Sequence, residues 1–210
     1  MSKNKILVIT ATLGDRITLK KTVDSVKSIS GNRIDHILIA PLSKVESLQL
    51  KFPDLKILPE PENYKGIYPA LNYGLLKFAK DYEYLTFIND DDFWLKDYQK
   101  LIDILDTQND VDVVYGKVIY FNNEGSPIFK QASSYRYKAF TKLLAHDVVL
   151  FTQQATLMRS SVFIKLKGFD DSYKLVGDSD FWIRAIRSNY NFKFVNSFCA
   201  GYMIQEGQLT

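Results

Sequence analysis

Three consecutive aspartates, Asp90 to Asp92, follow directly after the apolar run from Leu85 to Ile88. Two carboxylates about 4 Å apart repel each other by about 4 kcal/mol at an effective dielectric constant of about 20, so a nearby cation would offset a real cost. Hard oxygen ligands suit Mg²⁺ or Mn²⁺, which bind one or two carboxylates and leave other positions to phosphate and water. A solvated Asn-Asp turn explains the same residues, because these side chains favour turns. The triplet alone leaves both interpretations open.

Two further positions could carry chemistry. Asp178 begins an amphipathic run that extends to Asn189, and a carboxylate held in a cleft can act as a general base. An acid at a helix N-terminus more often caps the helix, and the residues alone favour the cap. Lys65 and Gly66 precede another helical run, where an ammonium or backbone amides could approach phosphate. A lysine in that place is commonly just a solvated charge.

The remaining reactive residue types point to structural roles. His36 and His146 have no partner at the spacing of a metal site or a catalytic triad, and Cys199 lies in an apolar, aromatic stretch typical of a core. Aromatic residues make up 14% of the chain, and some, such as Phe93 and Trp94, could stack on a base or a sugar. Most aromatic residues in a chain of this kind are core residues.

Predicted strands and helices, which would position these residues, alternate in the first half of the chain. Apolar runs predict strands at residues 5–10, 35–40, 56–58 and 84–88, and a three-and-four spacing predicts helices within 17–29 and 66–82. This order predicts an α/β fold with a mostly parallel sheet and right-handed crossovers. Ligands of such sheets bind outside the carboxyl ends of the strands, which is where the aspartates fall.

The order of elements changes after Lys96. We expect a strand at residues 112–121 that turns into a hairpin, a helix near 139–145, a strand within 148–158, a short helix ended by Gly168, a helix at 178–189 and a closing strand at 192–195. No repeat or linker separates the two halves. We therefore expect one domain over residues 1–210, with about 1–95 suited to a nucleotide and about 96–210 to another ligand.

Composition limits the class of protein. The chain has 210 residues, 46% of them hydrophobic, and a net charge of only +3, which does not indicate nucleic-acid binding. This small positive charge leaves open a peripheral contact with an anionic membrane surface. The single cysteine excludes an internal disulfide and fits a reducing compartment. The apolar run near the N-terminus is better explained as a core strand than as a signal peptide, so we expect a cytoplasmic protein.

Three segments in order, KGIYPALNYG, FINDDDFW and GFDDSYKLVGDSDFWIRAI, resemble the family 2 glycosyltransferases. These are inverting, nucleotide-sugar-dependent enzymes with the GT-A fold, and the similarity runs from Lys5 to about Asn196. The resemblance implies a Rossmann-like, mostly parallel central sheet flanked by helices, with a smaller mixed subregion on the acceptor side. It also implies a nucleotide-binding half at about 1–95 and an acceptor-binding half at about 96–210.

The resemblance implies roles for the acidic residues. Asp178 matches the general base that takes the proton from the acceptor hydroxyl. Asp91 matches the aspartate that binds Mn²⁺ or Mg²⁺, and Asp90 lies beside it near the donor ribose or diphosphate. Other positions match segments around the substrates. The donor side comprises Thr10, Ala11, Thr12 and Lys65; the supporting or acceptor-side residues are Asp92, Trp94, Gln153, Gln154, Asp180 and Arg184.

Three departures from the family pattern lie in the nucleotide-binding segments and beside Asp178. Family members usually carry aspartates after the second strand that contact the nucleotide base, whereas this chain has Pro41-Leu42-Ser43 there. The identity of the donor nucleotide is therefore left open, and the donor could be a UDP-, GDP- or dTDP-sugar. The family's Glu-Asp pair reads Gly177-Asp178, and an aspartate often found before Lys65-Gly66 is Tyr64.

The expected activity is metal-dependent, inverting transfer of a sugar from a nucleotide-sugar donor to a glycan or lipid-linked glycan, in bacterial surface polysaccharide synthesis. One alternative is a non-catalytic sugar-nucleotide or glycan-binding module of the same fold. A nucleotidyltransferase fits less well, because the loop TATLGDR holds one glycine and one arginine rather than a glycine-rich, basic phosphate loop. The expected location is the cytoplasm, with the inner membrane face as the alternative.

Overall fold

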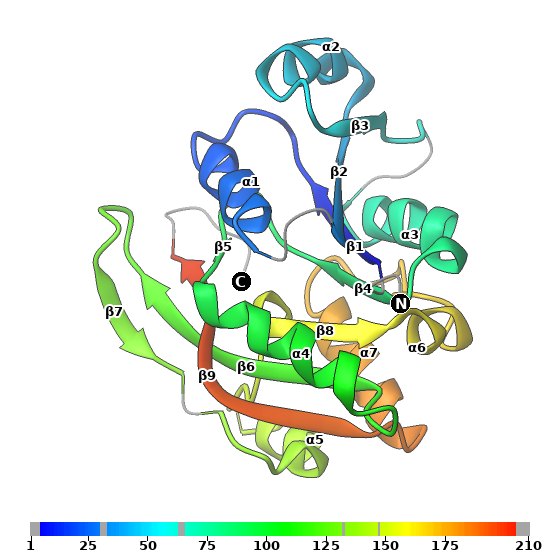
Figure 1. Cartoon of the computed structure of the whole chain (residues 1–210), viewed down its shortest axis with the longest axis vertical. Helices are drawn as coiled ribbons and strands as arrows, with labels where there is room; N and C mark the ends of the chain where they lie inside the picture. The colour runs from blue at the N-terminus through cyan, green and yellow to red at the C-terminus, as the bar shows by residue number, and fades with distance from the viewer. Residues whose placement is uncertain (1–4, 30–32, 63–65, 132, 147, 205–210) are drawn as a thin grey trace.

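The first half of the chain forms the parallel part of one twisted sheet (Figure 1). The computed structural model describes residues 5–29, 33–62, 66–131, 133–146 and 148–204. The four parallel strands are β1 (Ile6–Ala11), β2 (Ile34–Ala40), β3 (Lys56–Pro59) and β4 (Tyr84–Phe87), in the spatial order β3-β2-β1-β4. Ile9 lies opposite Ile37 on one side and Phe87 on the other. The predicted α/β order is confirmed for this half.

The second half continues the sheet with mixed strand directions. β8 (Thr156–Arg159) pairs antiparallel with β4, and β6 (Val113–Phe121) pairs antiparallel with β8. β9 (Phe192–Met203) runs parallel to β6, while β5 (Phe93–Trp94) and β7 (Pro127–Lys130) are antiparallel additions to β9 and β6. In Figure 1 the long strands β6 and β9 cross the view nearly at right angles to β2, which shows how strongly the sheet twists.

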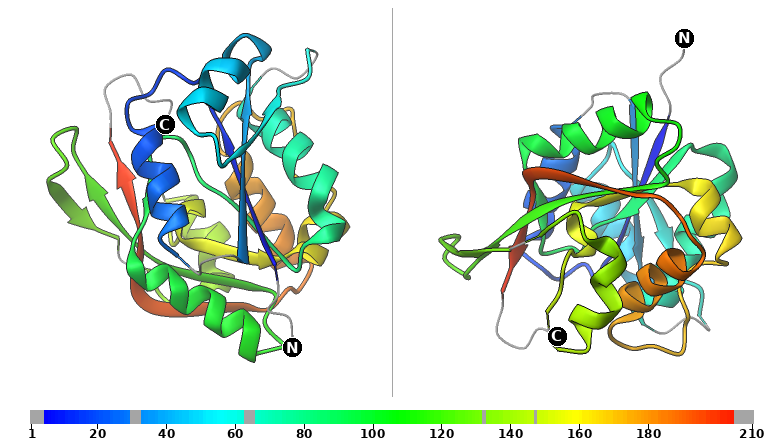
Figure 2. Two further views of the ribbon diagram at one scale, coloured as in Figure 1. Left: turned by 45° about the horizontal axis from the view of Figure 1, so that its top comes forward. Right: turned by 90° about the horizontal axis from the view of Figure 1, so that it is seen from below.

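Helices cover both faces of the sheet because each buried strand is apolar on both sides. Ile6 and Val8 of β1 pack in the cluster that includes α4 (Gln99–Thr107) and Val26 of α1 (Leu19–Lys27). Leu7 and Ile9 point the opposite way and pack with the other layer. That layer contains α3 (Ile67–Phe78), α5 (Phe140–Leu144), α6 (Ser160–Lys165) and α7 (Gly177–Arg187), as the views in Figure 2 show.

The close approach of α3 to β1 depends on Gly74. A Cβ atom at this position would lie 3.0 Å from Cδ1 of Ile9, so a larger residue would push the helix away from the strand. The helix begins after Gly66, whose φ of 113° is a backbone conformation that other residues rarely adopt. These two glycines place the N-terminus of α3 next to the carboxyl ends of the strands.

Several elements differ from those predicted. α2 (Leu42–Lys51) was not predicted, because it buries only Leu48 and leaves Leu42 and Leu50 exposed, so its periodicity is weak. The short β5 and the helix α4 were also missed. The predicted strand at 148–158 is a strand only from Thr156. Short 3₁₀ helices lie at Ala79–Asp81, Lys96–Tyr98, Tyr137–Ala139 and Gln153–Ala155. Across the described ranges, no helix has both the length and the apolar character needed to cross a membrane.

Candidate active site

The acidic loop, Asn89–Asp92, lies at the carboxyl ends of β1 and β4. Hydroxyl groups of threonines fix its backbone and one of its side chains. Thr12 Oγ1 donates to Asp90 Oδ2 at 2.6 Å, and Thr18 Oγ1 donates to the carbonyl oxygen of Asp90 at 3.0 Å. Thr22 Oγ1 donates to the carbonyl oxygen of Asp92 at 2.6 Å. The loop is therefore held by the end of β1 and the start of α1, and its carboxylates have set directions.

Arg16 supplies a positive charge to two of the three carboxylates. Its Nε lies 3.1 Å from Asp90 Oδ1 and its Nη1 lies 3.0 Å from Asp91 Oδ2. Both aspartates are nearly buried, and burial raises the pKa of each carboxyl group. The Arg16 charge opposes that shift in the pKa of both groups. The guanidinium thus lowers the cost of keeping two adjacent buried carboxylates ionised.

Asp92 points away from this pair and into the core. It is fully buried and accepts three N–H donors: Gln154 Nε2 at 2.8 Å, the backbone nitrogen of Met203 at 3.0 Å and Asn89 Nδ2 at 3.2 Å. Burial raises its pKa, and these three donors favour the ionised form. Asp92 therefore ties the acidic loop to the end of β9 and to the 3₁₀ turn at Gln153–Ala155.

The donor set at the loop fits a divalent cation that is shared with a phosphate ligand. Asp90 and Asp91 offer one or two hard carboxylates, the number that Mg²⁺ or Mn²⁺ usually takes when phosphate and water complete its shell. Within the described residues, no three His, Cys, Asp or Glu side chains gather closely enough to enclose an ion by themselves. The loop thus suits a metal bound together with a diphosphate, and such a metal would compete with Arg16.

The second acidic centre is Asp178, in the first turn of α7. The residue is partly buried, and Tyr68 Oη of α3 donates to its Oδ1 at 3.2 Å. Burial raises the pKa of Asp178, whereas hydrogen bonds from the Ser179 backbone and Tyr68 favour its ionised form. A carboxylate with a raised pKa is a stronger proton acceptor, as a general base requires.

The phenol of Tyr202, in β9, is influenced by the charges of both acidic centres. Burial raises the pKa of its phenol, and the negative charges of Asp92, Asp91 and Asp178 raise it further. A single side chain is thus within electrostatic reach of both the acidic loop and the proposed base. Tyr202 was not predicted as a site residue, because the closing strand was expected to end at residue 195. The apolar run from Phe198 to Met203 was the signal for a longer strand.

Two residues predicted for the site are buried. Thr10 is fully buried; its Oγ1 donates to the carbonyl oxygen of Ile88 at 2.8 Å and contacts His36 Nε2 at 2.9 Å. Trp94 is only 4% exposed and stacks on Tyr98 with a ring-centroid distance of 3.6 Å. Both side chains are buried in the core, and their contact with the donor or the acceptor side stays a prediction.

Other predicted residues lie around the site in supporting positions. Ala11 and Thr12 end β1 next to the acidic loop. Gln153 and Gln154 are buried behind it, and Oε1 of each lacks a hydrogen-bond partner among the described residues. Lys65 lies outside the described residues.

Arg184 joins α7 to the segment before it. Its Nε pairs with Asp180 Oδ2 at 2.7 Å, and its Nη1 and Nη2 donate to the carbonyl oxygens of Leu166 at 2.9 Å and Gly168 at 2.8 Å. Asp180 and Arg184 thus brace the segment that leads to Asp178.

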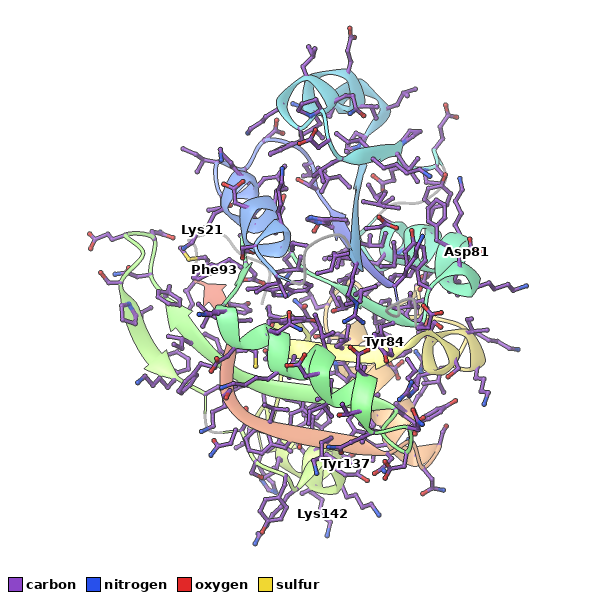
Figure 3. The ribbon with its side chains drawn as sticks, viewed as in Figure 1. Lys21, Asp81, Tyr84, Phe93, Tyr137 and Lys142 are labelled. Atoms are coloured by element: carbon purple, nitrogen blue, oxygen red, sulfur yellow. The ribbon has the colours of Figure 1, made fainter. Side chains whose placement is uncertain are left out.

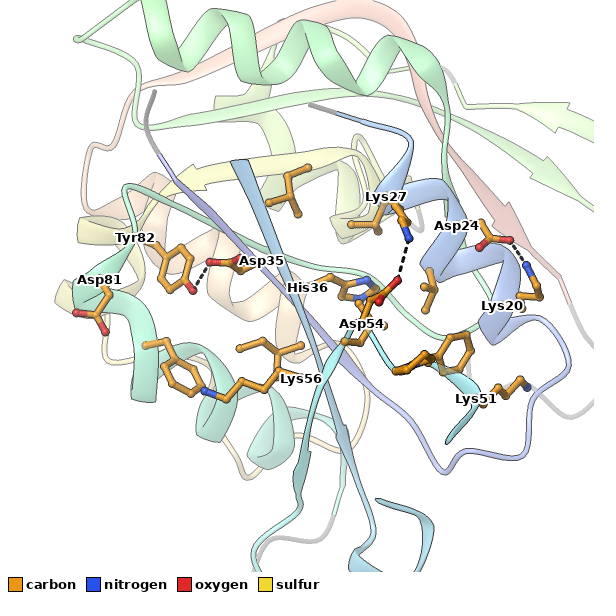
Figure 4. Close-up of a pocket in the computed structure, with 18 residues that line it drawn as sticks. Lys20, Asp24, Lys27, Asp35, His36, Lys51, Asp54, Lys56, Asp81 and Tyr82 are labelled. Carbon is orange, nitrogen blue, oxygen red and sulfur yellow. Dashed lines mark hydrogen bonds and ion pairs between the residues drawn. The ribbon is translucent and has the colours of Figure 1, made fainter. Parts of the chain in front are cut away.

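A large hollow lies elsewhere in the described part of the chain. It has a volume of about 870 Å³ and is lined by apolar and polar residues around the start of β2 and β3, among them Asp35, His36 and Lys56 (Figure 4). None of the described residues that line it belongs to the acidic loop or to α7. On α1, Lys21 Nζ lies 3.4 Å from the centre of the Phe93 ring, and the two side chains lie close together in Figure 3.

Comparison with known proteins shows what the sequence and the fold are similar to. The family model described as Glycosyl transferase family 2 matches residues 7–167. A protein of Methanocaldococcus jannaschii named as the uncharacterized glycosyltransferase MJ1057 is 28% identical over 125 residues, which cover 58% of this chain and 42% of that protein.

The fold is similar to that of S. aureus TarS. The crystal structure of TarS residues 1–349 with UDP-GlcNAc matches with a TM-score of 0.71 at 15% identity, and the match covers 97% of this chain and 60% of that one. The same fragment with UDP matches with a TM-score of 0.70 at 13% identity, covering 95% of this chain and 60% of that fragment. This likeness confirms the predicted GT-A type of α/β fold. The chain spans less than two thirds of the length of each of these relatives.

Proposed function

The chain belongs to the family 2 glycosyltransferases, and from this premise we propose that it transfers a sugar from a nucleotide-sugar donor to a hydroxyl group of a glycan, with inversion at the anomeric carbon. The observation that carries the proposal is the presence of two different acidic centres, the acidic loop at the carboxyl ends of β1 and β4 and Asp178 in the first turn of α7. Asp90 and Asp91 pair with a cation, whereas Asp178 is a partly buried carboxylate paired with a phenol.

The two centres divide the reaction between them. The acidic loop would bind the donor diphosphate, and Asp178 would accept the proton of the attacking hydroxyl. As that O–H bond breaks, the acceptor oxygen forms a bond to the anomeric carbon, and the bond from that carbon to the phosphate oxygen breaks. The leaving electron pair goes to the nucleoside diphosphate. One base and one displacement invert the configuration, in contrast to the double displacement of retaining glycosidases.

Asp91, together with Asp90, would hold Mn²⁺ or Mg²⁺ in this scheme. When bound, such an ion supplies Lewis-acid neutralisation of charge on the diphosphate. Support comes from the position of the two carboxylates at the carboxyl end of β4 and from the burial that raises the pKa of both. Arg16 is the cation that they contact without a metal.

The nucleotide base of the donor is proposed from two observations. The TarS structures are complexes with UDP-GlcNAc and with UDP, so a uridine donor is the first to test. In this chain β2 is followed at once by Pro41 and then α2, which leaves no acidic side chain at the position where relatives are expected to contact the base. GDP- and dTDP-sugars therefore stay in the proposal as alternatives.

The proposed acceptor is a glycan or lipid-linked glycan of bacterial surface polysaccharide synthesis, glycosylated in the cytoplasm. Family membership and the net charge of +3, which suits an anionic membrane surface, support this part of the proposal.

A nucleotide-sugar screen tests the function. Thermal shift and calorimetry are run with UDP-, GDP-, dTDP- and CMP-sugars, each with and without MnCl₂, and nucleotide release is then measured with a panel of glycan acceptors. We expect one nucleotide class to stabilise the protein only with Mn²⁺ and to be consumed when acceptor is added. Binding without nucleotide release under any condition would instead support a non-catalytic module.

A further inference from the structure

Helix α3 holds both ends of the segment that leads into α7. At its start, Asn72 Oδ1 accepts the backbone N–H of Phe169 at 2.8 Å, and Asn72 Nδ2 donates to the Phe169 carbonyl oxygen at 2.9 Å. At its end, Tyr68 Oη donates to Asp178 Oδ1 at 3.2 Å. Tyr68 and Asn72 are four residues apart, so they lie on the same face of α3. The exposed residues between 170 and 176 are thus bridged by one rigid helix.

The ring of Tyr68 is fixed by packing. It is only 6% exposed and lies 5.4 Å from the Phe169 ring, centroid to centroid. It also rests directly on Gly177, where a Cβ atom would come within 2.7 Å of the Tyr68 ring carbon Cε2. Gly177 stands where the related enzymes are expected to have glutamate. Its missing side chain is what lets the phenol reach Asp178.

The backbone before Gly177 is strained in support of this contact. Val176 has φ 54° and ψ 12°, a left-handed conformation that β-branched residues adopt rarely, and 57% of it is exposed. Its own side chain therefore gains little from this position. A strained backbone conformation persists where the surrounding contacts hold it in place, and such conformations are frequent at functional sites. Here the contacts that hold it are those of Tyr68 and Asn72 on either side.

We propose that Tyr68 is a positioning residue for Asp178, holding its carboxylate in one orientation for proton transfer. This role rests on the proposed function of Asp178 as the base. Because the ring cannot move, its hydroxyl hydrogen bond fixes the carboxylate relative to α3. The hydrogen bond also favours the ionised form, so Tyr68 tunes the pH at which the base is ready to accept a proton.

The matching test is Tyr68→Phe, which keeps the ring and removes only the hydroxyl. Among the described residues, the titratable groups with an electrostatic interaction with Asp178 are the phenols of Tyr68 on α3 and Tyr202 on β9, and both stay neutral in the acidic range where Asp178 titrates. Loss of a hydrogen bond to a charged group should move the acidic limb of the kcat/KM profile up by about one pH unit. On that limb kcat/KM should fall about tenfold at a given pH, with the donor Kd changed less than twofold.

Two variants separate this role from simple packing. Tyr73→Phe is the control, because Tyr73 lies on the same helix but its hydroxyl accepts from Lys77 Nζ at 3.1 Å; its pH profile should match wild type. Gly177→Ala pushes a methyl group into the Tyr68 ring and should move the acidic limb in the same direction. In the double variant Tyr68→Phe/Gly177→Ala the shift should not exceed the larger single shift. Circular dichroism and Tm confirm that each variant is folded.

The outcomes separate this inference from the proposed function. Full turnover by Asp178→Asn would overturn the function of Asp178 itself. An inactive Asp178→Asn together with a wild-type profile in Tyr68→Phe would overturn only the role of Tyr68. A lower kcat in Tyr68→Phe with an unmoved acidic limb would also overturn it, because a merely structural contact lowers the rate without changing the proton affinity of the base.

Discussion

Nη1 of Arg16 lies 3.0 Å from Oδ2 of Asp91, the carboxylate that we propose as the metal ligand. The same guanidinium reaches Asp90 through Nε, so one side chain offsets the repulsion between two adjacent acids. Arg16 and a divalent cation would therefore compete for the same oxygens. When a metal and a diphosphate bind, the guanidinium must move, and the phosphate groups are the nearest new partners that the proposed reaction offers it.

Arg16→Gln should bind Mn²⁺ more tightly than wild type when no donor is present. The Arg16 side chain is 39% exposed, so its pairing is screened and worth roughly 1 kcal/mol, which corresponds to about a fivefold gain in Mn²⁺ affinity. Calorimetry with MnCl₂ alone measures this gain. Lys44→Gln is the control, since Lys44 pairs with Asp15 in the same region but does not contact the acidic loop. Weaker Mn²⁺ binding by Arg16→Gln would show that the two cations do not compete.

Asp91→Asn and Asp92→Asn should fail in different ways. Asp92 accepts three N–H groups, so an amide in its place would turn an N–H toward at least one of these donors and destabilise the fold by about 2–3 kcal/mol. Asp91→Asn should lose Mn²⁺-dependent donor binding with a much smaller change in the free energy of unfolding. Urea titration and calorimetry on both variants measure the two effects. Equal stability of the two variants would contradict the structural role given to Asp92.

His36 should make the protein less stable at mildly acidic pH. Burial lowers its pKa from 6.5 to about 3, so the unfolded chain binds a proton below pH 6.5 that the folded chain does not. The contribution of His36 to the free energy of unfolding is therefore fully present above pH 6.5, the unfolded pKa. It is lost as the pH falls from 6.5 toward 3, by about 1.4 kcal/mol per pH unit.

His36→Gln isolates this effect, because the other titrating groups are common to both proteins. Between pH 7 and pH 5 the difference in free energy of unfolding should move by about 2 kcal/mol in favour of the variant. Chemical denaturation at both pH values measures it. A difference that does not change with pH would mean that His36 is protonated in the folded protein.

Sequence patterns were sufficient for the features that depend on neighbouring residues. The apolar run before Asp90 predicted β4, and its parallel partners placed the aspartates at a ligand-binding edge. Asp178 was correctly placed at the start of a helix. Both follow from local periodicity, which is strong when a strand is buried on both faces.

Contacts between distant residues could not be predicted in this way. Tyr68 and Asp178 are 110 positions apart, and helical periodicity says only that Tyr68 lies on α3. The burial of the Thr10 side chain was not predicted, because alternate residues of a strand point to opposite faces and the sequence did not show which face Thr10 takes. Thr10 turns inward to His36, although it lies close to the strand end that carries the site. Arg16 was missed because a loop arginine gives no sign of which acid it contacts.

The most direct test of the account is the Asp178→Asn variant, assayed with the Mn²⁺-bound nucleotide sugar identified by the screen and an active acceptor. Its donor Kd should stay within twofold of the wild-type value, because the acidic loop is untouched. Its transfer rate should fall at least a hundredfold, because the acceptor proton has no base. A transfer rate within threefold of wild type would contradict the assignment of Asp178 as the residue that accepts this proton.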